Sequence, residues 1–425
     1  MVDRGDLLDR VLTGGAELDG NPVTVDAGLC VRLLDAGVRP ADVVVLHGLS
    51  GASLVLAALA VWECDAVPAP VGTGVPVQLA ACARLSGDGT VRPRGDASVV
   101  ADLSSTAVLH LTSGSTDRPK VVRRGADSVW CEADGYCDGL AWRADDRVAV
   151  PLPLAHSLGW GVAMSALLSG VSVDATPLVR AESLARRADA GLVSMLALTA
   201  PVARLLVATR RQGAAALRAA VVGAGPVTDD LATAFRDRFD VFLTRGYGST
   251  ETGGTFLGAR HLGRPMSGVD IVEPAVGERG ELVLRLPAPV EGYLGGHGST
   301  RLWRTGDLVD WAGGEVRFVA RRLANLRLNG RFLDTEQVDR MLRRNAEVTD
   351  VYPLVLPRAD TPEIEDFYVF VEGGPAEDEL RNSLDGCPGP LPRIVRCNRI
   401  PRTTLGKPDR SALIALVGRP RQGGA

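Results

Sequence analysis

The sequence predicts an α/β fold in which a large N-terminal domain of stacked βαβ units ends in a small antiparallel β unit and is followed by a smaller α+β domain. β-Branched runs alternate with helical stretches from about residue 42 to residue 242, which is the rhythm of parallel strands joined by helices. After about Gly258 the pattern changes to short strands between glycine and proline turns. The 425 residues leave room for two or three domains, and we expect the domains 1–321 and 322–425.

The expected elements of the first part share one order, in which a strand-like run precedes a helical stretch. The expected strands are 43–47, 66–71, 107–111, 148–153, 192–198 and 219–223. The expected helices are 52–62, 159–168, 200–212 and 227–238. Such units build a largely parallel sheet, and ligands of these sheets bind at the loops where the strands end.

The second part is expected to begin with four short strands, at 269–274, 280–286, 301–311 and 314–320. A helix is expected from about Asp334 to Arg344, and an α+β tail follows it.

Composition and charge restrict the classes of function. Hydrophobic residues make up 46% and charged residues 23%, as in ordinary globular chains, and the formal charge of −4 provides no excess of positive charge for a nucleic acid or an anionic membrane. The longest apolar run, residues 54–62, is too short to span a bilayer, and the charged start is unlike a signal peptide, so we expect a cytoplasmic protein. The seven cysteines form no C-x-x-C pair, which argues against a disulfide framework or a zinc ribbon.

Only two lysines, Lys120 and Lys407, stand among the 47 basic residues, and all the others are arginine. Arginine is a planar fork with a permanent charge, whereas lysine is a compact point charge on a flexible stem. We interpret the two lysines as positions where a single ammonium has to reach one oxygen.

The segment 111–120, LTSGSTDRPK, follows an expected strand and is rich in hydroxyl groups and glycine. Its hydroxyls and unobstructed backbone amides form a donor surface suited to phosphate oxygens. The residues that we assign to phosphate binding are Thr112, Ser113, Gly114, Ser115, Thr116 and Lys120. The segment is not a P-loop, since G-x-x-x-x-G-K-[ST] is absent, and an ordinary polar turn would explain it equally well if it stood alone.

This loop resembles the phosphate loop T-S-G-[ST]-T-G-x-P-K of the adenylate-forming superfamily, which includes acyl-CoA and aryl-CoA synthetases, adenylation domains of peptide synthetases, and luciferases. Further motifs of that superfamily follow in its order, at 151–161, 221–227, 246–254, 280–286, 303–311, 321–338 and 401–410. The resemblance covers residues 42 to 410 and is nearest to freestanding enzymes that adenylate aryl or acyl acids. It implies ATP and Mg²⁺ as cofactors and a small carboxylic acid as substrate.

The resemblance assigns adenine binding to two motifs. It implies that the backbone of Gly223, Ala224 and Gly225 approaches the purine, where larger side chains would obstruct it. It also implies that Tyr247 stacks on the adenine ring. Without the resemblance, packing in the core would be the ordinary explanation of Tyr247.

Further residues are assigned to phosphate, metal and ribose. The resemblance implies that Thr250 donates to the α-phosphate and that Glu251 is an oxygen ligand of Mg²⁺, and we count both as catalytic. It implies that Asp307 accepts from both ribose hydroxyls and that Arg321 lies near ribose or phosphate. Taken alone, Glu251 and Asp307 would each be explained by a turn.

The resemblance makes Lys407 the catalytic cation that bridges the substrate carboxylate and the α-phosphate. Charge builds on the phosphate oxygens as the carboxylate attacks and pyrophosphate leaves, and a preplaced ammonium offsets it. The same resemblance makes residues 322–425 a mobile lid that brings this lysine into the site.

Two segments depart from the superfamily's pattern. Asp117 stands where the phosphate loop has its second glycine, and a carboxylate near phosphates is unfavourable unless it turns away or faces the metal. In the hinge, residues 320–323 read A-R-R-L where the superfamily has G-R-x-[DK]. Leu323 therefore leaves open whether the domain rotation needed for thioester formation takes place.

The acid pocket is expected around residues 151–161. Peptide-synthetase domains for α-amino acids usually have an aspartate there, and this chain has none to pair with a buried ammonium. The sequence A-H-S at 155–157 is similar to the A-H-N of aryl-acid activating enzymes, so we favour an aryl or short acyl acid. The residues assigned to this pocket are His156, which is also counted as catalytic, Ser157, Trp160 and Gly248. Core packing would explain Trp160 equally well.

We expect adenylation of the acid with release of pyrophosphate, and then transfer of the acyl group to a thiol of CoA or of a carrier protein. Transfer to an amine or another non-thiol nucleophile is an alternative, which the hinge departure permits. A nucleotide-binding partner protein without catalysis is a third hypothesis, which Lys407, Glu251 and Asp307 disfavour. The high Ala, Gly and Arg content suggests a GC-rich bacterial genome and secondary metabolism, and a monomer and a homodimer both remain open.

Overall fold

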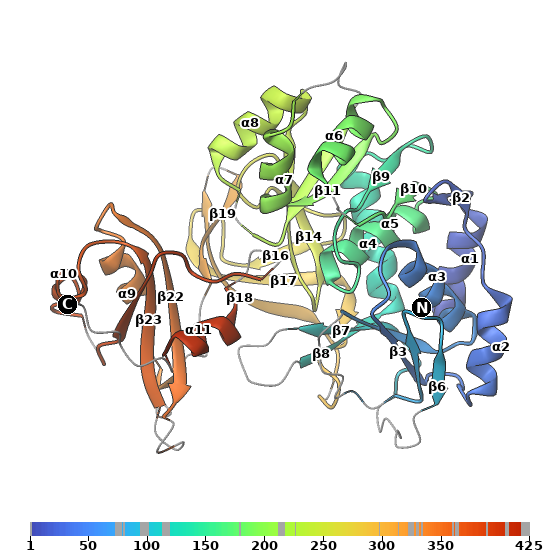
Figure 1. Ribbon diagram of the computed structural model, residues 1–425, viewed down its shortest axis with the longest axis horizontal. Helices are drawn as coiled ribbons and strands as arrows, with labels where there is room; N and C mark the ends of the chain where they lie inside the picture. The colour runs from blue at the N-terminus through green and yellow to red at the C-terminus, as the bar shows by residue number, and fades with distance from the viewer. Residues whose placement is uncertain are drawn as a thin grey trace. The chain divides into compact units, whose positions relative to one another are not determined.

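The computed structural model describes most of the chain (Figure 1). The described residues are 2–72, 79, 81–93, 102–112, 120–177, 180–210, 217–225, 227–296, 298–312, 314–321, 327–328, 331–332, 335–358, 361, 365–387, 390–403 and 408–417. The chain forms two compact units. The first consists of Met1–Val276, Val283–Arg304 and Trp311–Arg317, and the second of Gly277–Leu282, Thr305–Asp310 and Phe318–Ala425. A single domain boundary near Arg321 stays a prediction.

The first unit contains a nine-stranded sheet with the order β15-β14-β13-β12-β11-β9-β10-β1-β2. Its strands are β1 (Glu17–Leu18), β2 (Asn21–Pro22), β9 (Arg147–Ala149), β10 (Ser172–Asp174), β11 (Met195–Thr199), β12 (Ala219–Gly223), β13 (Leu243–Ser249), β14 (Gly253–Gly258) and β15 (Arg264–Pro265). All neighbours from β13 to β1 are parallel, whereas β14, β15 and β2 pair antiparallel at the two ends. The largely parallel sheet is therefore confirmed at its centre.

Three sequence predictions about these strands are corrected. The strand expected at 148–153 ends at Ala149, since Pro151 and Pro153 have no N–H to give to a ladder. The strand expected at 107–111 is not part of a parallel ladder: it is β7 (Thr106–Thr112), which forms a two-stranded antiparallel hairpin with β8 (Lys120–Gly125). Antiparallel pairing also begins before Gly258, because β13 and β14 form a hairpin on the large sheet.

Eight helices are described in the first unit, and several have clear capping signals. They are α1 (Arg4–Thr13), α2 (Ala27–Asp35), α3 (Gly51–Glu63), α4 (Ala126–Leu140), α5 (Ser157–Leu168), α6 (Ala181–Asp189), α7 (Ala200–Val207) and α8 (Asp229–Phe239). Asp3 and Asp6 form a capping box on α1, and the Thr228 hydroxyl accepts from Leu231 N at the start of α8. The expected helix 200–212 is shorter in the structure, where α7 ends at Val207.

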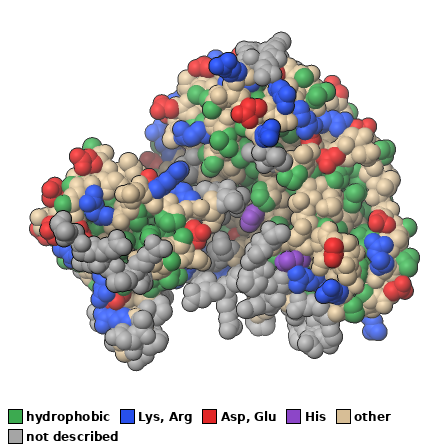
Figure 2. Space-filling view, in the orientation of Figure 1, with side chains coloured by type: hydrophobic (Ala, Val, Ile, Leu, Met, Phe, Trp, Pro, Cys, Tyr) green, Lys and Arg blue, Asp and Glu red, His purple; other side chains and the backbone are tan. Residues whose placement is uncertain are grey.

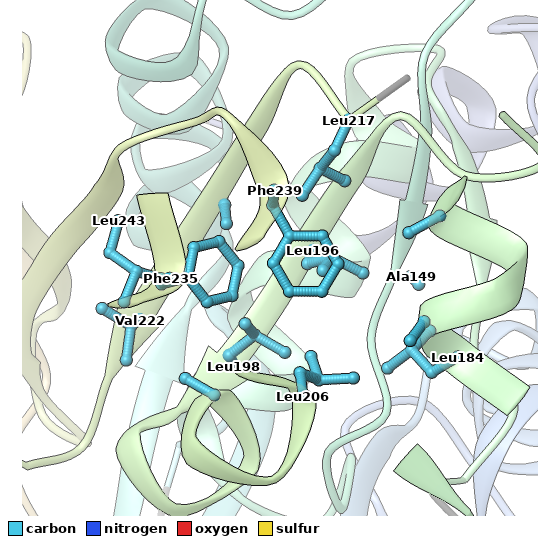
Figure 3. Close-up of a cluster of buried hydrophobic side chains, with 14 of the residues drawn as sticks. Ala149, Leu184, Leu196, Leu198, Leu206, Leu217, Val222, Phe235, Phe239 and Leu243 are labelled. Atoms are coloured by element: carbon cyan, nitrogen blue, oxygen red, sulfur yellow. The ribbon is translucent and has the colours of Figure 1, made fainter. Parts of the chain in front are cut away.

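The core beside the large sheet is built by α6, α7 and α8 against β11 and β12 (Figure 1). Figure 3 shows Phe235 and Phe239 of α8 side by side, with ring centroids 4.7 Å apart, next to Leu196 and Leu198 of β11. Burial of such aromatic and aliphatic side chains is the main source of stability in a domain of this kind. The cluster includes Val222 near the end of β12, so this packing supports the strand end beside which the candidate site lies.

A second, four-stranded sheet in the first unit has the order β4-β3-β5-β6. Its strands are β3 (Val43–His47), β4 (Val67–Val71), β5 (Ala83–Ser86) and β6 (Val91–Pro93). The parallel strands β3 and β4 are joined by the buried helix α3, so the first βαβ unit expected from the sequence is confirmed.

The remaining strands begin with a sheet of order β16-β17-β18-β19, and its last three strands each contribute residues to both units. It consists of β16 (Asp270–Glu273), β17 (Arg279–Val290), β18 (Thr300–Ala312) and β19 (Glu315–Arg321). The second unit adds β20 (Arg327–Leu328), β21 (Arg331–Phe332), α9 (Thr335–Leu342), β22 (Val348–Pro357), β23 (Glu365–Gly373), α10 (Glu377–Asn382), β24 (Arg393–Cys397) and α11 (Arg410–Val417). Its sheet of order β22-β23-β24 and its helices form the expected α+β tail.

The surface and the helices agree with the composition. On the face shown in Figure 2, acidic and basic side chains are interspersed, as expected for a chain with a formal charge of −4. Of the described helices, not one combines the length and the apolar character that a membrane span requires.

Candidate active site

The candidate site lies where β12 and β13 end and α5 begins. A Cβ atom added to Gly223, the last residue of β12, would lie 3.1 Å from Leu158 Cδ1 and 3.4 Å from Gly246 O. The hydroxyl of Ser157, the first residue of α5, lies 3.4 Å from the hydroxyl of Thr250. The carboxyl ends of neighbouring parallel strands are the usual binding edge of such a sheet. Three segments far apart in the sequence therefore meet at that edge.

The segment after β12 has an unusual backbone. Ala224 has a φ of 62°, in the left-handed region that favours glycine, and both Ala224 and Gly225 are exposed. A non-glycine residue there costs about 1 kcal/mol, and such residues cluster at ligand sites. The segment is therefore exposed beside Gly223, and its approach to a purine stays a prediction.

The hairpin of β13 and β14 carries Tyr247 and Gly248. The Tyr247 ring packs edge-on against the buried Phe256, with centroids 5.7 Å apart, yet Tyr247 itself is only partly buried. A Cβ atom on Gly248 would lie 2.0 Å from Gly253 O, so only glycine fits there. The close approach of the two strands explains Gly248 without a ligand, and its place in the acid pocket stays a prediction.

The start of β14, at the base of the turn between β13 and β14, packs against a buried ion pair that was not predicted from the sequence. Arg124 of β8 and Glu132 of α4 lie 2.9 Å apart, and their side chains are 3% and 5% exposed. Glu132 Oε1 also accepts a hydrogen bond of 2.8 Å from Gly254 N. Cβ atoms on Gly253 or Gly161 would lie 2.6 Å from the Glu132 carboxylate, so glycine at both positions makes room for it. We call Arg124, Glu132, Gly253 and Gly254 the turn base.

At the tip of the same turn, Glu251 is partly buried and has a neutral partner. The hydroxyl of Tyr293 donates to Glu251 Oε1 at 2.6 Å. Burial raises the pKa of Tyr293, and the neighbouring Glu251 carboxylate raises it further, so the phenol keeps its proton. Lys120 Nζ lies 5.0 Å from the centre of the Tyr293 ring. Tyr293 was also missed, because it lies 42 residues after Glu251 in a segment without a recognised motif.

The acid-pocket residues fall into two groups. His156 is exposed at the N-cap of α5, and Ser157 is partly buried beside Thr250. Trp160 is buried, with its ring edge-on to His110 at 5.8 Å and to Trp62 at 6.4 Å. Core packing accounts for Trp160, and its contact with a substrate stays a prediction. Burial, and after it the charges of Arg124 and His156, lower the pKa of His110 to about 3.

Part of the predicted phosphate loop can be placed. Thr112 ends β7 and Lys120 begins β8, and the two residues are paired across the hairpin, with the Thr112 hydroxyl donating to Lys120 O at 3.3 Å. The residues between them, Ser113, Gly114, Ser115 and Thr116 among them, lie outside the described residues, as do Asp117, Leu323 and Lys407.

Besides Lys407, two predicted site residues belong to the second unit. Asp307 is buried on β18, and its N–H donates to the Thr305 hydroxyl at 3.1 Å. Arg321 is the last residue of β19, and its side chain lies outside the described part. The roles of both residues at a ribose stay predictions.

A family model described as AMP-binding enzyme matches residues 78–294, which is just over half of the chain. The chain belongs to this family. The AMP-binding enzymes are the adenylate-forming superfamily of AMP-forming acid ligases that the motifs indicated, and CoA ligases are among them. The 2-succinylbenzoate–CoA ligase of Listeria monocytogenes is 24% identical over 332 residues, which cover 73% of this chain and 70% of that enzyme.

Two solved structures of similar proteins cover nearly the whole chain. ATP-bound MatB from Rhodopseudomonas palustris has a TM-score of 0.71 at 17% identity, over 97% of this chain and 98% of that one. The amide bond synthetase McbA from Marinactinospora thermotolerans has a TM-score of 0.70 at 19% identity, over 97% of this chain and 99% of that one. At these identities the likeness shows the fold alone, and it confirms a mixed α/β architecture.

The match to the AMP-binding family contains the geometry described above. The β7–β8 hairpin, the start of α5, the end of β12, the β13–β14 turn and Tyr293 all lie within residues 78–294. Asp307, Arg321 and Lys407 lie beyond it. The family match therefore covers the residues that the first unit brings together.

Proposed function

We propose that this chain activates a carboxylic acid with MgATP to give an acyl-adenylate and pyrophosphate. The observation that carries the proposal is the 3.4 Å approach of Ser157 and Thr250. The first belongs to the motif assigned to the acid and the second to the motif assigned to the α-phosphate. The reaction requires the acid and the α-phosphate to be held within bonding reach of each other, and such positioning is a large part of catalysis.

The proposed chemistry joins one carboxylate oxygen to the α-phosphorus. The bond from that phosphorus to the bridging oxygen breaks, and pyrophosphate leaves with the electron pair. Thr250 donates to the α-phosphate, and Lys407 offsets the charge that builds on its oxygens. Thr112 to Thr116 and Lys120 bind the outgoing phosphates, and the segment 223–225 and Tyr247 bind adenine. Asp307 and Arg321 bind the ribose side.

Glu251 fits the role of a Mg²⁺ ligand. Within the described part of the chain, no group of three or more His, Cys, Asp or Glu could hold a metal ion by itself. Mg²⁺ in nucleotide sites is commonly bound by one or two carboxylates together with the substrate's phosphates, so one partly buried carboxylate is sufficient. The bound ion would neutralise charge on the phosphates.

We favour an aryl or short acyl acid as substrate. The segment 151–161 offers no carboxylate to an amino-acid ammonium, and in its middle His156 is exposed and Ser157 is partly buried. The Listeria relative is by its name a ligase of an aryl acid and CoA, which supports an aromatic acid and a thiol acceptor. A thiol of CoA or of a carrier protein is therefore our first choice of acceptor.

An amine acceptor is the second candidate. The hinge sequence at 320–323 departs from the pattern associated with thioester formation, and one neighbour of the same fold is an amide bond synthetase. The two acceptors use the same adenylate, so they differ only in the second step.

The adenylation step is tested by acid-dependent exchange of labelled pyrophosphate into ATP with Mg²⁺ present. A panel of benzoic, cinnamic, short aliphatic and amino acids is compared at equal concentration. We expect exchange with aryl or short acyl acids and none with α-amino acids. Exchange with amino acids alone would contradict the substrate class, and no exchange in protein that binds ATP would contradict the reaction.

The assignment of Lys407 is tested in the same assay. Lys407→Ala should lose exchange by about a hundredfold or more while ATP binding is retained, because the ammonium acts as charge develops. Lys407→Arg is the matched variant, since it keeps the charge and changes its shape. An unchanged rate in Lys407→Ala would remove the lysine from the mechanism.

A further inference from the structure

Tyr293 touches two groups that the proposed function assigns to the phosphates and the metal. Its hydroxyl donates to Glu251 Oε1 at 2.6 Å, and Lys120 Nζ lies 5.0 Å from the centre of its ring. The hydroxyl and the ring face thus contact groups of opposite charge. An ammonium within about 6 Å of an aromatic ring is attracted by its π face.

The backbone around Tyr293 is tied to the strand that carries Lys120. Arg123 N donates to Gly292 O at 2.9 Å, and Leu294 N donates to Val121 O at 2.8 Å. Tyr293 itself forms a β-bridge with Val122. The segment 292–294 therefore runs beside β8 as a short added strand, and the aromatic ring is held in register with the β7–β8 hairpin.

The residue before this segment anchors it from the other side. The two oxygens of Glu291 accept from the hydroxyls of Ser105 and Thr106, each at 2.6 Å. Arg123 lies 3.5 Å from the same carboxylate. A Cβ atom on Gly125 would lie 2.6 Å from Glu291 Oε1, so this glycine leaves the room that the anchor needs. Tyr293 is thus attached to a rigid support rather than to a free loop.

We propose that Tyr293 is a positioning residue that sets the Glu251 carboxylate for Mg²⁺ and the Lys120 ammonium for the triphosphate. The proposal rests on the proposed function, since it concerns the same nucleotide site. The Tyr293 hydrogen bond to Oε1 uses one of the carboxylate's acceptor positions, so the others would be available to the metal. Groups that hold a metal ligand from behind commonly change metal affinity by 10- to 100-fold when they are removed.

Two variants separate the two contacts of Tyr293. Tyr293→Phe removes the hydroxyl and keeps the ring, whereas Tyr293→Leu removes both. ATP binding to the full chain is measured by calorimetry without any acid, first in EDTA and then at increasing Mg²⁺. For Tyr293→Phe we expect the Mg²⁺ concentration for half-maximal enhancement to rise about tenfold, with ATP affinity in EDTA unchanged. For Tyr293→Leu we expect ATP affinity in EDTA to fall severalfold as well, because Lys120 loses its ring.

The matched control is Tyr368→Phe, which removes a phenol hydroxyl on β23 of the second unit, 3.5 Å from an Arg393 guanidinium nitrogen. It should bind ATP as the wild type does at every Mg²⁺ concentration. A combined Tyr293→Phe and Glu251→Gln variant should need no more Mg²⁺ than Glu251→Gln alone, since the hydroxyl is proposed to act through that carboxylate.

The outcomes distinguish this proposal from the function on which it rests. A wild-type Mg²⁺ dependence in Tyr293→Phe would overturn the positioning role while leaving adenylation intact. Equal losses of ATP affinity with and without Mg²⁺ would also overturn it, because they would indicate a structural role only. A wild-type chain that binds no ATP would overturn the proposed function and this inference together.

Discussion

A different carboxylate lies at each end of the β13–β14 turn, and the two carboxylates have opposite kinds of partner. At the turn base, Glu132 is buried, faces the permanent charge of Arg124 and accepts from a backbone N–H. At the tip, three residues before Gly254, Glu251 is partly buried and its partner is a neutral phenol. A carboxylate whose charge is already balanced by a protein cation attracts a cationic ligand only weakly. The difference teaches that Glu132 supports the turn, whereas Glu251 keeps its negative charge available.

The comparison predicts that charge at the turn base governs stability and that charge at the tip governs ligand binding. Breaking a buried ion pair leaves the other charge without compensation, which costs far more than the pair contributes. Removing the charge of a partly buried carboxylate that has a neutral partner should change the free energy of unfolding only slightly. The two kinds of change therefore separate stability from function within one turn.

The largest effect is expected from Arg124→Met. The substitution keeps much of the side-chain volume but leaves the Glu132 carboxylate buried without its cation, so we expect a loss of about 3–5 kcal/mol in the free energy of unfolding. The control is Arg147→Met, which breaks the ion pair between Arg147 and Glu17 in the same unit, where the side chains are 31% and 42% exposed. That change should cost no more than about 1 kcal/mol. Equal losses by denaturant titration would contradict the comparison.

A second expectation concerns pH, because His110 lies near the charge of Arg124. Burial, and after it Arg124 and His156, lower the pKa of His110 to about 3, against about 6.5 in an unfolded chain. Between these values the unfolded state binds the proton and the folded state does not, so stability is full above pH 6.5 and falls with decreasing pH. We expect a fall of about 1.4 kcal/mol per pH unit from this residue below pH 6.5.

The contribution of His110 is isolated by comparison with His110→Leu. Denaturant titrations at pH 7 and pH 5.5 should show a smaller loss in the variant than in the wild type. The four carboxylates with lowered pKa values act only at lower pH and do not disturb this window; they are Asp88, Asp102, Asp146 and Asp174. An identical loss of unfolding free energy between pH 7 and pH 5.5 in the two proteins would show that folding does not lower the pKa of His110.

The sequence singled out residues at the tip of the turn and none at its base. Glu251, Thr250 and Tyr247 stand in one short motif, so a resemblance could find them. Arg124 and Glu132 lie on a strand and a helix, and the glycine that contacts them is 122 residues after Glu132. A charged residue in a sequence is ordinarily a surface residue, and its burial follows only from the fold.

The fold was predicted where a local pattern decides it. The helix α3 between β3 and β4 follows from periodicity and β-branched runs, and the centre of the large sheet follows from the βαβ order. The antiparallel pairing of β7 with β8 was missed, because strand direction depends on the connection, and the residues between the two strands were interpreted from the sequence as a phosphate loop and not as the turn of a hairpin. Tyr293 was missed for a related reason, since its bridge to Val122 joins distant parts of the chain.

The smallest effect on stability is expected from Glu251→Gln, and it is the sharpest test of the comparison. The amide oxygen of glutamine can still accept from the Tyr293 hydroxyl, so the free energy of unfolding should change by less than about 0.5 kcal/mol. The negative charge proposed for Mg²⁺ is lost, and pyrophosphate exchange should fall by at least about tenfold, with partial recovery at high Mg²⁺. Stability and pyrophosphate exchange are measured for both variants. Arg124→Met should lose stability, whereas Glu251→Gln should lose activity. A large loss of stability in Glu251→Gln would mean that the tip carboxylate supports the turn as Glu132 does, and the division between base and tip would be wrong.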